Sequence, residues 1–197
     1  MDFNLQTIEK FITSGIWLTA EEAQTIYEIS KHASKAVEIG CAYGGSTCLL
    51  LAGIGNGKLA SIDPFVVDSM GSWSADELTC KSGVNKFITT YKLSTDWELI
   101  NDYSYNVVKT WKAKIDLLFI DGDHNYDSVK ADFNSWSKFI NRGGTILIHD
   151  SQQPFNSDPA VFNNGWPGPT RLVREVLSQS KFKLHSICDS LTIISTL

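Results

Sequence analysis

Acidic residues close two apolar runs in the second half of the sequence. Asp121 follows IDLLFI, and Asp150 ends GGTILIHD. If these runs are neighbouring parallel strands, both carboxylates project from the same edge of a sheet. Carboxylates this close repel each other, and a hard divalent cation such as Mg²⁺ would relieve the repulsion. Asp121 and Asp150 are therefore candidate metal ligands; in the alternative, Asp121 contacts a cofactor and Asp150 caps a loop.

The tight turn after Asp121 carries two candidate proton acceptors, Asp123 and His124. Either could take a proton from a substrate hydroxyl, and histidine is the better matched to neutral pH. The alternative is a structural turn in which Asp123 bonds backbone amides and His124 packs against the following helix. His149, next to Asp150, is expected to be a hydrogen-bonding neighbour of the site rather than a base.

A glycine-rich turn follows the first apolar run, in VEIGCAYGGST. Gly40, Gly44 and Gly45 would let the backbone approach a ligand closely, and the amides of the next helix could bind its anionic part. Asp63 ends the next run, where a carboxylate can accept hydrogen bonds from ribose hydroxyls. These features predict a ligand with a nucleoside part. The alternative is that the glycines only permit a tight turn and that Asp63 belongs to an Asp-Pro turn.

The elements that must position these residues alternate along the chain. Continuous rather than alternating hydrophobicity in the strands indicates a parallel sheet covered on both faces. The predicted fold is α/β: a Rossmann-like, doubly wound, mostly parallel seven-stranded sheet with an antiparallel C-terminal strand pair. Strands are expected in AVEIG, KLASIDPF, WELIND, IDLLFI, GGTILIHD, FKLHSIC and LTIISTL, and helices in GGSTCLLLAGIG, from Val84 to Leu93, in VKADFNSWSKFI and in RLVREVLSQ.

The chain is expected to be a single domain, residues 1–197, with a helical cover over 1–34 and the Rossmann-like core over 35–197. Thr19 and Glu22 fit a capping box at the start of the second helix. Two irregular stretches are expected. The first runs from the end of KLASIDPF to about Gly83, and the second from Ser151 to Pro169. Aromatic residues in them could cover a small-molecule pocket, anchor the loops or form a subunit contact. These residues are Trp73, Phe155, Phe162 and Trp166, whereas Trp136 has the spacing of helix core packing.

Composition and local sequence patterns disfavour several kinds of partner and cellular location. The 17 basic and 22 acidic residues give a net charge of -5, which disfavours a nucleic-acid partner. We see neither a signal peptide nor an apolar stretch of membrane-spanning length, so we expect a cytoplasmic protein without a membrane partner. Cys41, Cys48, Cys80 and Cys188 lack C-x-x-C spacing, which predicts buried reduced thiols.

VEIGCAYGGST, SIDPF, IDLLFIDGDHNYDSVKAD and GGTILIHD, in this order, resemble the class I S-adenosylmethionine-dependent methyltransferases, in particular the small-molecule O-methyltransferase-like families of methyltransferase family 24 type. The resemblance implies S-adenosylmethionine as the cofactor. It places Glu38, Gly40, Gly44 and Ser46 at the methionine end, Asp63 at the ribose and Tyr103 or Ser104 near the adenine, with Tyr43 and Asp121 as further contacts.

The function that this resemblance implies is O-methylation of a small hydroxylated metabolite. Metal-dependent methyltransferases carry acids at the ends of the same two strands, which Asp121 and Asp150 match, but Ser151 stands where Asn or Asp is expected. Mg²⁺ assistance is thus one interpretation and metal-free transfer the other. The alternative functions are an N-methyltransferase, a nicotinamide-dependent oxidoreductase, which the absence of G-x-G-x-x-G disfavours, and a cofactor-binding protein without catalysis. A homodimer through the N-terminal helices is a further expectation.

Overall fold

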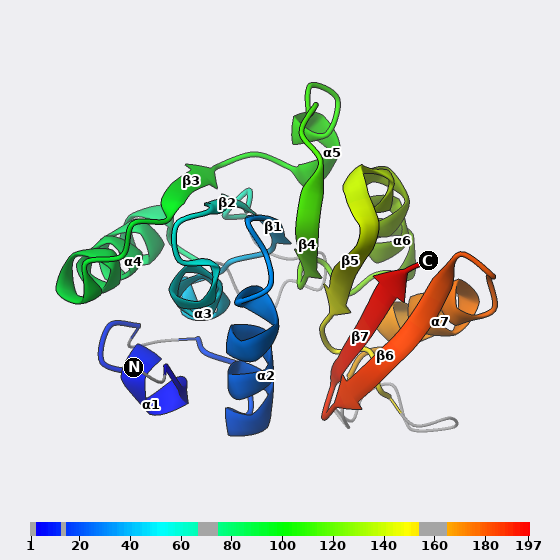
Figure 1. The fold of residues 1–197 in the computed structure, drawn as a ribbon, viewed down its shortest axis with the longest axis horizontal. Helices are drawn as coiled ribbons and strands as arrows, with labels where there is room; N and C mark the ends of the chain where they lie inside the picture. The colour runs from blue at the N-terminus through cyan, green and yellow to red at the C-terminus, as the bar shows by residue number, and fades with distance from the viewer. Residues whose placement is uncertain (1–2, 13–14, 67–74, 154–164) are drawn as a thin grey trace.

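The computed structural model describes residues 3–12, 15–66, 75–153 and 165–197, and its elements form a sheet with helices on both sides (Figure 1). The seven strands lie in the order β3-β2-β1-β4-β5-β7-β6. Strands β1 to β5 are parallel to one another, whereas β7 is antiparallel to both β5 and β6. This arrangement confirms the predicted Rossmann-like sheet with its antiparallel C-terminal pair. The strands are β1 (Lys35–Ile39), β2 (Lys58–Ile62), β3 (Asp96–Ile100), β4 (Ile115–Ile120), β5 (Ile140–Ile148), β6 (Phe182–Cys188) and β7 (Leu191–Thr196).

Side chains of the central strands are buried alternately in two hydrophobic clusters, one on each face of the sheet. In β4, Leu117 and Phe119 join one cluster and Leu118 and Ile120 the other. The first cluster is covered by α2 (Ala20–Ser30), α3 (Gly45–Ile54) and α4 (Glu77–Tyr91), and the second by α6 (Tyr126–Trp136) and α7 (Pro167–Leu177). Because both faces are covered, the strands read as continuous apolar runs. Trp136 is completely buried, which confirms its predicted core role.

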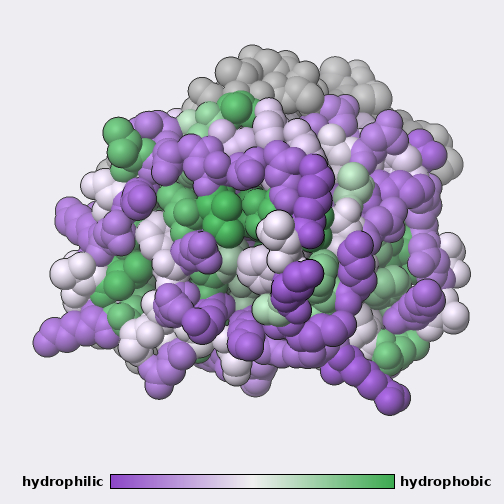
Figure 2. All heavy atoms as spheres, turned by 90° about the horizontal axis from the view of Figure 1, so that it is seen from above, coloured by the Kyte–Doolittle hydropathy of each residue, from purple (hydrophilic) through white to green (hydrophobic). Residues whose placement is uncertain are grey.

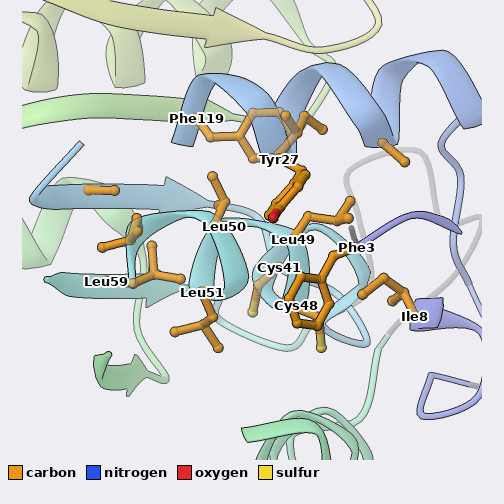
Figure 3. Packing of buried hydrophobic residues seen from close by; sticks show 14 of the residues in the cluster. Phe3, Ile8, Tyr27, Cys41, Cys48, Leu49, Leu50, Leu51, Leu59 and Phe119 are labelled. Atoms are coloured by element: carbon orange, nitrogen blue, oxygen red, sulfur yellow. The ribbon is translucent and has the colours of Figure 1, made fainter. Parts of the chain in front are cut away.

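The N-terminal segment packs on α3 (Figure 3). The ring of Phe3 meets those of Tyr27 and Phe87 at centroid distances of 5.7 and 5.5 Å. The capping box at α2 is confirmed, since the Glu22 amide donates to Thr19 Oγ1 at 3.1 Å and Glu22 Oε2 accepts from the Thr19 amide at 2.9 Å. The predicted helical cover is shorter than expected, because α1 (Leu5–Ile8) has only four residues and the described residues up to Thr19 add no further helix.

Two predicted loop boundaries are wrong. Helix α4 begins at Glu77 rather than Val84, because Asp76 caps it by accepting a hydrogen bond from the Thr79 amide at 2.9 Å. Helix α7 begins at Pro167, inside the stretch predicted to be irregular, since proline is well suited to a first helical turn. Trp73, Phe155 and Phe162 lie outside the described residues. The remaining short elements are α5 (Ser104–Val107) and the 3-10 turn η1 (Ser137–Phe139).

The strand order reverses between β1 and β4, since the chain moves outward from β1 to β3 and then returns to β4. Ligands of doubly wound sheets bind beyond the carboxyl ends of the strands at such a point. The backbone links these ends: the Asp121 amide donates to the Ile39 carbonyl at 2.8 Å, and the His149 amide to the Ile120 carbonyl at 3.0 Å. The residues that follow β1, β4 and β5 therefore meet at one edge.

Figure 2 shows one face of the molecule, seen from above in the view of Figure 1; it is largely hydrophilic, with a hydrophobic area near its middle. In the part of the chain that the structure describes, no helix combines the length and apolar character needed to cross a membrane. All four cysteines are free, and Cys41, Cys48 and Cys80 are buried as predicted, but Cys188 is only half-buried.

Candidate active site

The glycine-rich turn after β1 approaches the end of β4 closely. Gly40 has a φ of +83°, and a Cβ atom built on it would lie 2.1 Å from the Asp121 carbonyl oxygen. Gly44, with a φ of +93°, is the N-cap of α3 and provides no side-chain cap. The first amides of a helix have no partner within the helix. The turn therefore brings the backbone close to Asp121 and presents α3 amides that can bind an anionic group.

Glu38 is completely buried below this turn and accepts three hydroxyl hydrogen bonds. Ser46 and Ser61 donate from Oγ at 2.6 Å, and Thr47 donates from Oγ1 at 2.7 Å. Burial raises the pKa of the Glu38 carboxyl to about 7, although these hydroxyls lower it. Glu38 and Ser46, both expected at the methionine end of the cofactor, are thus bonded to each other and tie β1 to α3.

Asp63, the expected ribose contact, stiffens the same turn. Its Oδ2 accepts hydrogen bonds from the Cys41 and Ala42 amides at 3.0 and 2.9 Å, and its Oδ1 from the Phe65 amide at 2.8 Å. The residue is half-buried. It therefore lies beside the glycine-rich turn and holds its backbone, and its role as the ribose contact stays a prediction.

The remaining expected cofactor residues differ in exposure. Tyr103 is 41% exposed and stacks on Tyr105, with ring centroids 5.0 Å apart. Ser104 is buried, and its hydroxyl donates to Asp132. Of the two candidates for the adenine, Tyr103 is thus the one that a ligand can reach. Tyr43 is half-buried on the glycine-rich turn.

Asp121, His124 and Asp150 converge at the ends of β4 and β5, and we call them the Asp–His cluster. One ligand atom from each lies within 4.8 Å of the others. His124 Nε2 is 3.1 Å from Asp150 Oδ2, close enough for an ion pair but without hydrogen-bond geometry. Among the described residues, His124 Nε2 and Asp150 Oδ1 are buried without a hydrogen-bond partner. Two carboxylates and an imidazole with such orphaned atoms fit a divalent cation.

The two residues expected as bases have different surroundings. Asp123 accepts from the Asn125 amide at 3.2 Å and from Ser128 Oγ at 2.7 Å, the contacts of the structural turn that was the alternative for this residue. His124 instead stacks on Trp166, with centroids 5.3 Å apart and ring planes 12° apart. Burial lowers the pKa of His124, but the Asp150 and Asp121 carboxylates outweigh burial and raise it above 6.5.

Sequence reasoning missed how Glu22 reaches this site. Its Oε2 lies 3.3 Å from His149 Nε2, and His149 Nδ1 lies 3.1 Å from Asp121 Oδ1. His149 is therefore the hydrogen-bonding neighbour that was expected. Burial disfavours the Glu22 carboxylate, but hydrogen bonding and charge from His149 outweigh this and lower the Glu22 pKa to about 2. The capping box was the only signal for Glu22, and a capping box does not indicate a site residue.

A family model described as a methyltransferase domain matches residues 37–151, which include the glycine-rich turn and the Asp–His cluster. The chain belongs to this methyltransferase family. An uncharacterized protein of Acanthamoeba polyphaga mimivirus is 32% identical to this chain over 145 residues, which are 71% of the chain. The chain spans 59% of the length of that relative.

Solved structures share the fold of the methyltransferase domain. The O-methyltransferase TomG of Streptomyces achromogenes, in complex with S-adenosylmethionine, matches with a TM-score of 0.68 and 14% identity, over 96% of this chain and 88% of that one. An O-methyltransferase of Bacillus cereus in complex with S-adenosylhomocysteine matches with a TM-score of 0.66 and 15% identity, over 97% and 91% of the two chains. The fold is that of the class I methyltransferases.

Proposed function

We propose that this methyltransferase domain transfers the methyl group of S-adenosylmethionine to a hydroxyl oxygen of a small metabolite. The observation that carries the proposal is the meeting of Gly40 and Asp121, which sets the glycine-rich turn beside the Asp–His cluster. A cofactor bound on the turn would present its methyl group to an acceptor at the cluster. The O-methyltransferases that share the fold support oxygen as the acceptor atom.

The chain offers separate groups for the parts of the cofactor. The amides of the first turn of α3 suit its carboxylate, because a helix N-terminus favours negative charge. The Asp63 carboxylate accepts three amide hydrogen bonds from the turn and its surroundings, which leaves one lone pair, on Oδ1, for a ribose hydroxyl. The exposed Tyr103 ring can stack on adenine. These contacts would hold the sulfonium methyl in line with the acceptor oxygen.

Methyl transfer requires the acceptor hydroxyl to lose its proton. In our proposal the hydroxyl oxygen forms a bond to the methyl carbon, the carbon–sulfur bond breaks, S-adenosylhomocysteine leaves and the proton passes to His124 Nε2. Asp150, 3.1 Å from this nitrogen, would stabilise the imidazolium. Asp123 is less suited, because its carboxylate is occupied by Asn125 and Ser128.

Asp121, His124 and Asp150 would also hold a divalent cation such as Mg²⁺. When bound, such an ion would supply the positive charge that lowers the pKa of a coordinated hydroxyl. His124 Nε2 would then serve as a ligand and not as the proton acceptor. Removing divalent ions distinguishes these two roles of the Asp–His cluster.

The test is to incubate the protein with S-adenosylmethionine and a panel of phenols, catechols and sugars, with chelator, with Mg²⁺ and with Mn²⁺. We expect S-adenosylhomocysteine and a methyl ether. If activity survives chelation, the result supports His124 as the proton acceptor. If chelation abolishes activity and only added metal restores it, the result supports a cation bound by the Asp–His cluster. An added set of amines tests the alternative acceptor atom. A methylamine product from these amines, or cofactor binding without turnover on any acceptor, would overturn the proposal in favour of an N-methyltransferase or a protein without catalysis.

A further inference from the structure

His149 connects the Asp–His cluster to the N-terminal helical segment. It follows β5 directly and is 4% exposed. Its Nδ1 is 3.1 Å from Asp121 Oδ1 and 3.6 Å from Asp150 Oδ1, and its Nε2 faces Glu22 Oε2 at 3.3 Å. The imidazole ring therefore stands between α2 and the two carboxylates of the cluster.

Glu22 has more contacts than its place in a capping box requires. The box uses only Oε2, which accepts from the Thr19 amide at 2.9 Å. Oε1 accepts from both the amide and the hydroxyl of Ser190, at 2.8 and 2.7 Å. Glu22 is 2% exposed, and these donors come from Thr19, the N-cap of α2, and from the turn between β6 and β7. Its carboxylate is thus held from several directions before it meets His149.

Each ring nitrogen of His149 faces a different carboxylate. Carboxylate oxygens only accept hydrogen bonds, so the nitrogen that bonds one of them must donate. Nε2 is directed to Glu22 and Nδ1 to Asp121. A ring fixed at one end by a buried carboxylate cannot rotate without losing that bond. The orientation of the Asp121 carboxylate therefore depends on a residue of α2.

We propose that His149 is a positioning residue that fixes the Asp121 carboxylate at the acceptor site, and that Glu22 holds His149 in place. In this arrangement α2 takes part in setting the geometry of the site as well as covering the sheet. The contact chain Glu22–His149–Asp121 stands on the structure alone, while its effect on methyl transfer rests on the proposed function.

The contact chain can be tested by long-range proton–nitrogen NMR of the protein labelled with ¹⁵N-histidine, without cofactor or acceptor. We expect exchange-protected N–H signals from the His149 ring. Glu22→Gln should alter chiefly the Nε2 signal, and Asp121→Asn chiefly the Nδ1 signal. Thr19→Ala is the matched control, because it removes the hydroxyl that caps α2 but leaves the amide that bonds Glu22.

The catalytic consequence is tested with the same variants and any acceptor that the wild type methylates. Glu22→Gln should lower kcat about tenfold with S-adenosylmethionine affinity unchanged, since the hydrogen bonds described for Glu22 go to Thr19, Ser190 and His149. Thr19→Ala should lower the melting temperature and keep kcat within about twofold.

Unchanged His149 signals in Glu22→Gln, or equal changes in Thr19→Ala, would overturn the contact chain. Equal kcat in Glu22→Gln and wild type would overturn the positioning role. A wild type that methylates no acceptor would count against the proposed function, and the NMR result would still decide the contact chain.

Discussion

Gly40 and Asp121 approach so closely that a methyl group on Gly40 would lie 2.1 Å from the Asp121 carbonyl oxygen. This approach joins the turn proposed to hold the cofactor to the cluster proposed to hold the acceptor. Asp121 also donates its amide to Ile39, the last residue of β1, at 2.8 Å. The two halves of the site thus share one backbone junction at the reversal of strand order.

Gly40→Ala should damage this junction. The added Cβ meets backbone atoms that cannot yield easily, and the φ of +83° is itself unfavourable for alanine. Gly143→Ala is the matched control, because its φ is +76° but nothing lies within 4 Å of its added Cβ. Both variants should lose about 1 to 3 kcal/mol from backbone strain. Urea unfolding should show a larger loss of unfolding free energy for Gly40→Ala than for Gly143→Ala, and calorimetry should show weaker S-adenosylmethionine binding for Gly40→Ala only. Equal losses of unfolding free energy in the two variants would contradict the close approach of Gly40 to Asp121.

Stability should depend on pH through Glu38. Burial raises its pKa from 4.5 to about 7, so the folded protein holds this proton more tightly than the unfolded chain does. The resulting contribution to the free energy of unfolding is largest below pH 4.5. It decreases by about 3 kcal/mol as the pH rises to 7 and changes little above that. Glu38→Gln cannot ionise. The stability of wild type minus that of Glu38→Gln, from urea unfolding between pH 4.5 and 8, should therefore decrease with pH; a constant difference would refute the effect.

Tyr103 and Ser104 can be separated by substitution. Tyr103→Ala should weaken S-adenosylmethionine binding about fivefold, because base stacking on an aromatic ring is worth about 1 kcal/mol or more. Ser104→Ala should instead lower the melting temperature, because its buried hydroxyl bonds Asp132. Calorimetric titration and thermal unfolding of both variants check this. Loss of cofactor affinity in Ser104→Ala, with Tyr103→Ala unaffected, would reverse the assignment.

Trp166 should act through His124, on which it stacks. Trp166→Ala frees the imidazole and should lower kcat about tenfold or more, while S-adenosylmethionine affinity changes less than about twofold. Trp166→Phe retains a ring and should recover most of the rate. Weaker cofactor binding in Trp166→Ala, without a change in kcat, would exclude this role.

Much of the fold follows from local sequence patterns. The runs IDLLFI and TILI predict buried strands, because parallel strands covered on both faces need apolar residues throughout. The start of α4 was missed because its signal is one capping residue, Asp76, at the edge of a stretch without clear periodicity. The start of α7 does not follow from the sequence, because prolines such as Pro167 and Pro169 are typical of loops as well as of a first helical turn.

The sequence also predicts which acids lie at the carboxyl edge, since Asp121 and Asp150 follow apolar runs that form the adjacent strands β4 and β5. It does not predict the contact between Glu22 and His149, which are 127 residues apart. Such a contact depends on where α2 docks, and that position is set by packing against α3 rather than by any local pattern. The exposure of Tyr103 and burial of Ser104 likewise require the three-dimensional arrangement.

The most direct test of the central claim is calorimetric titration of the protein with S-adenosylmethionine and, separately, with NAD. We predict micromolar binding of S-adenosylmethionine, clear weakening in Asp63→Asn, and no detectable binding of NAD. Asp63→Asn keeps one oxygen for the turn amides but loses the charge expected to hold the ribose. Absence of S-adenosylmethionine binding by the folded wild type, or tighter binding of NAD, would contradict the account.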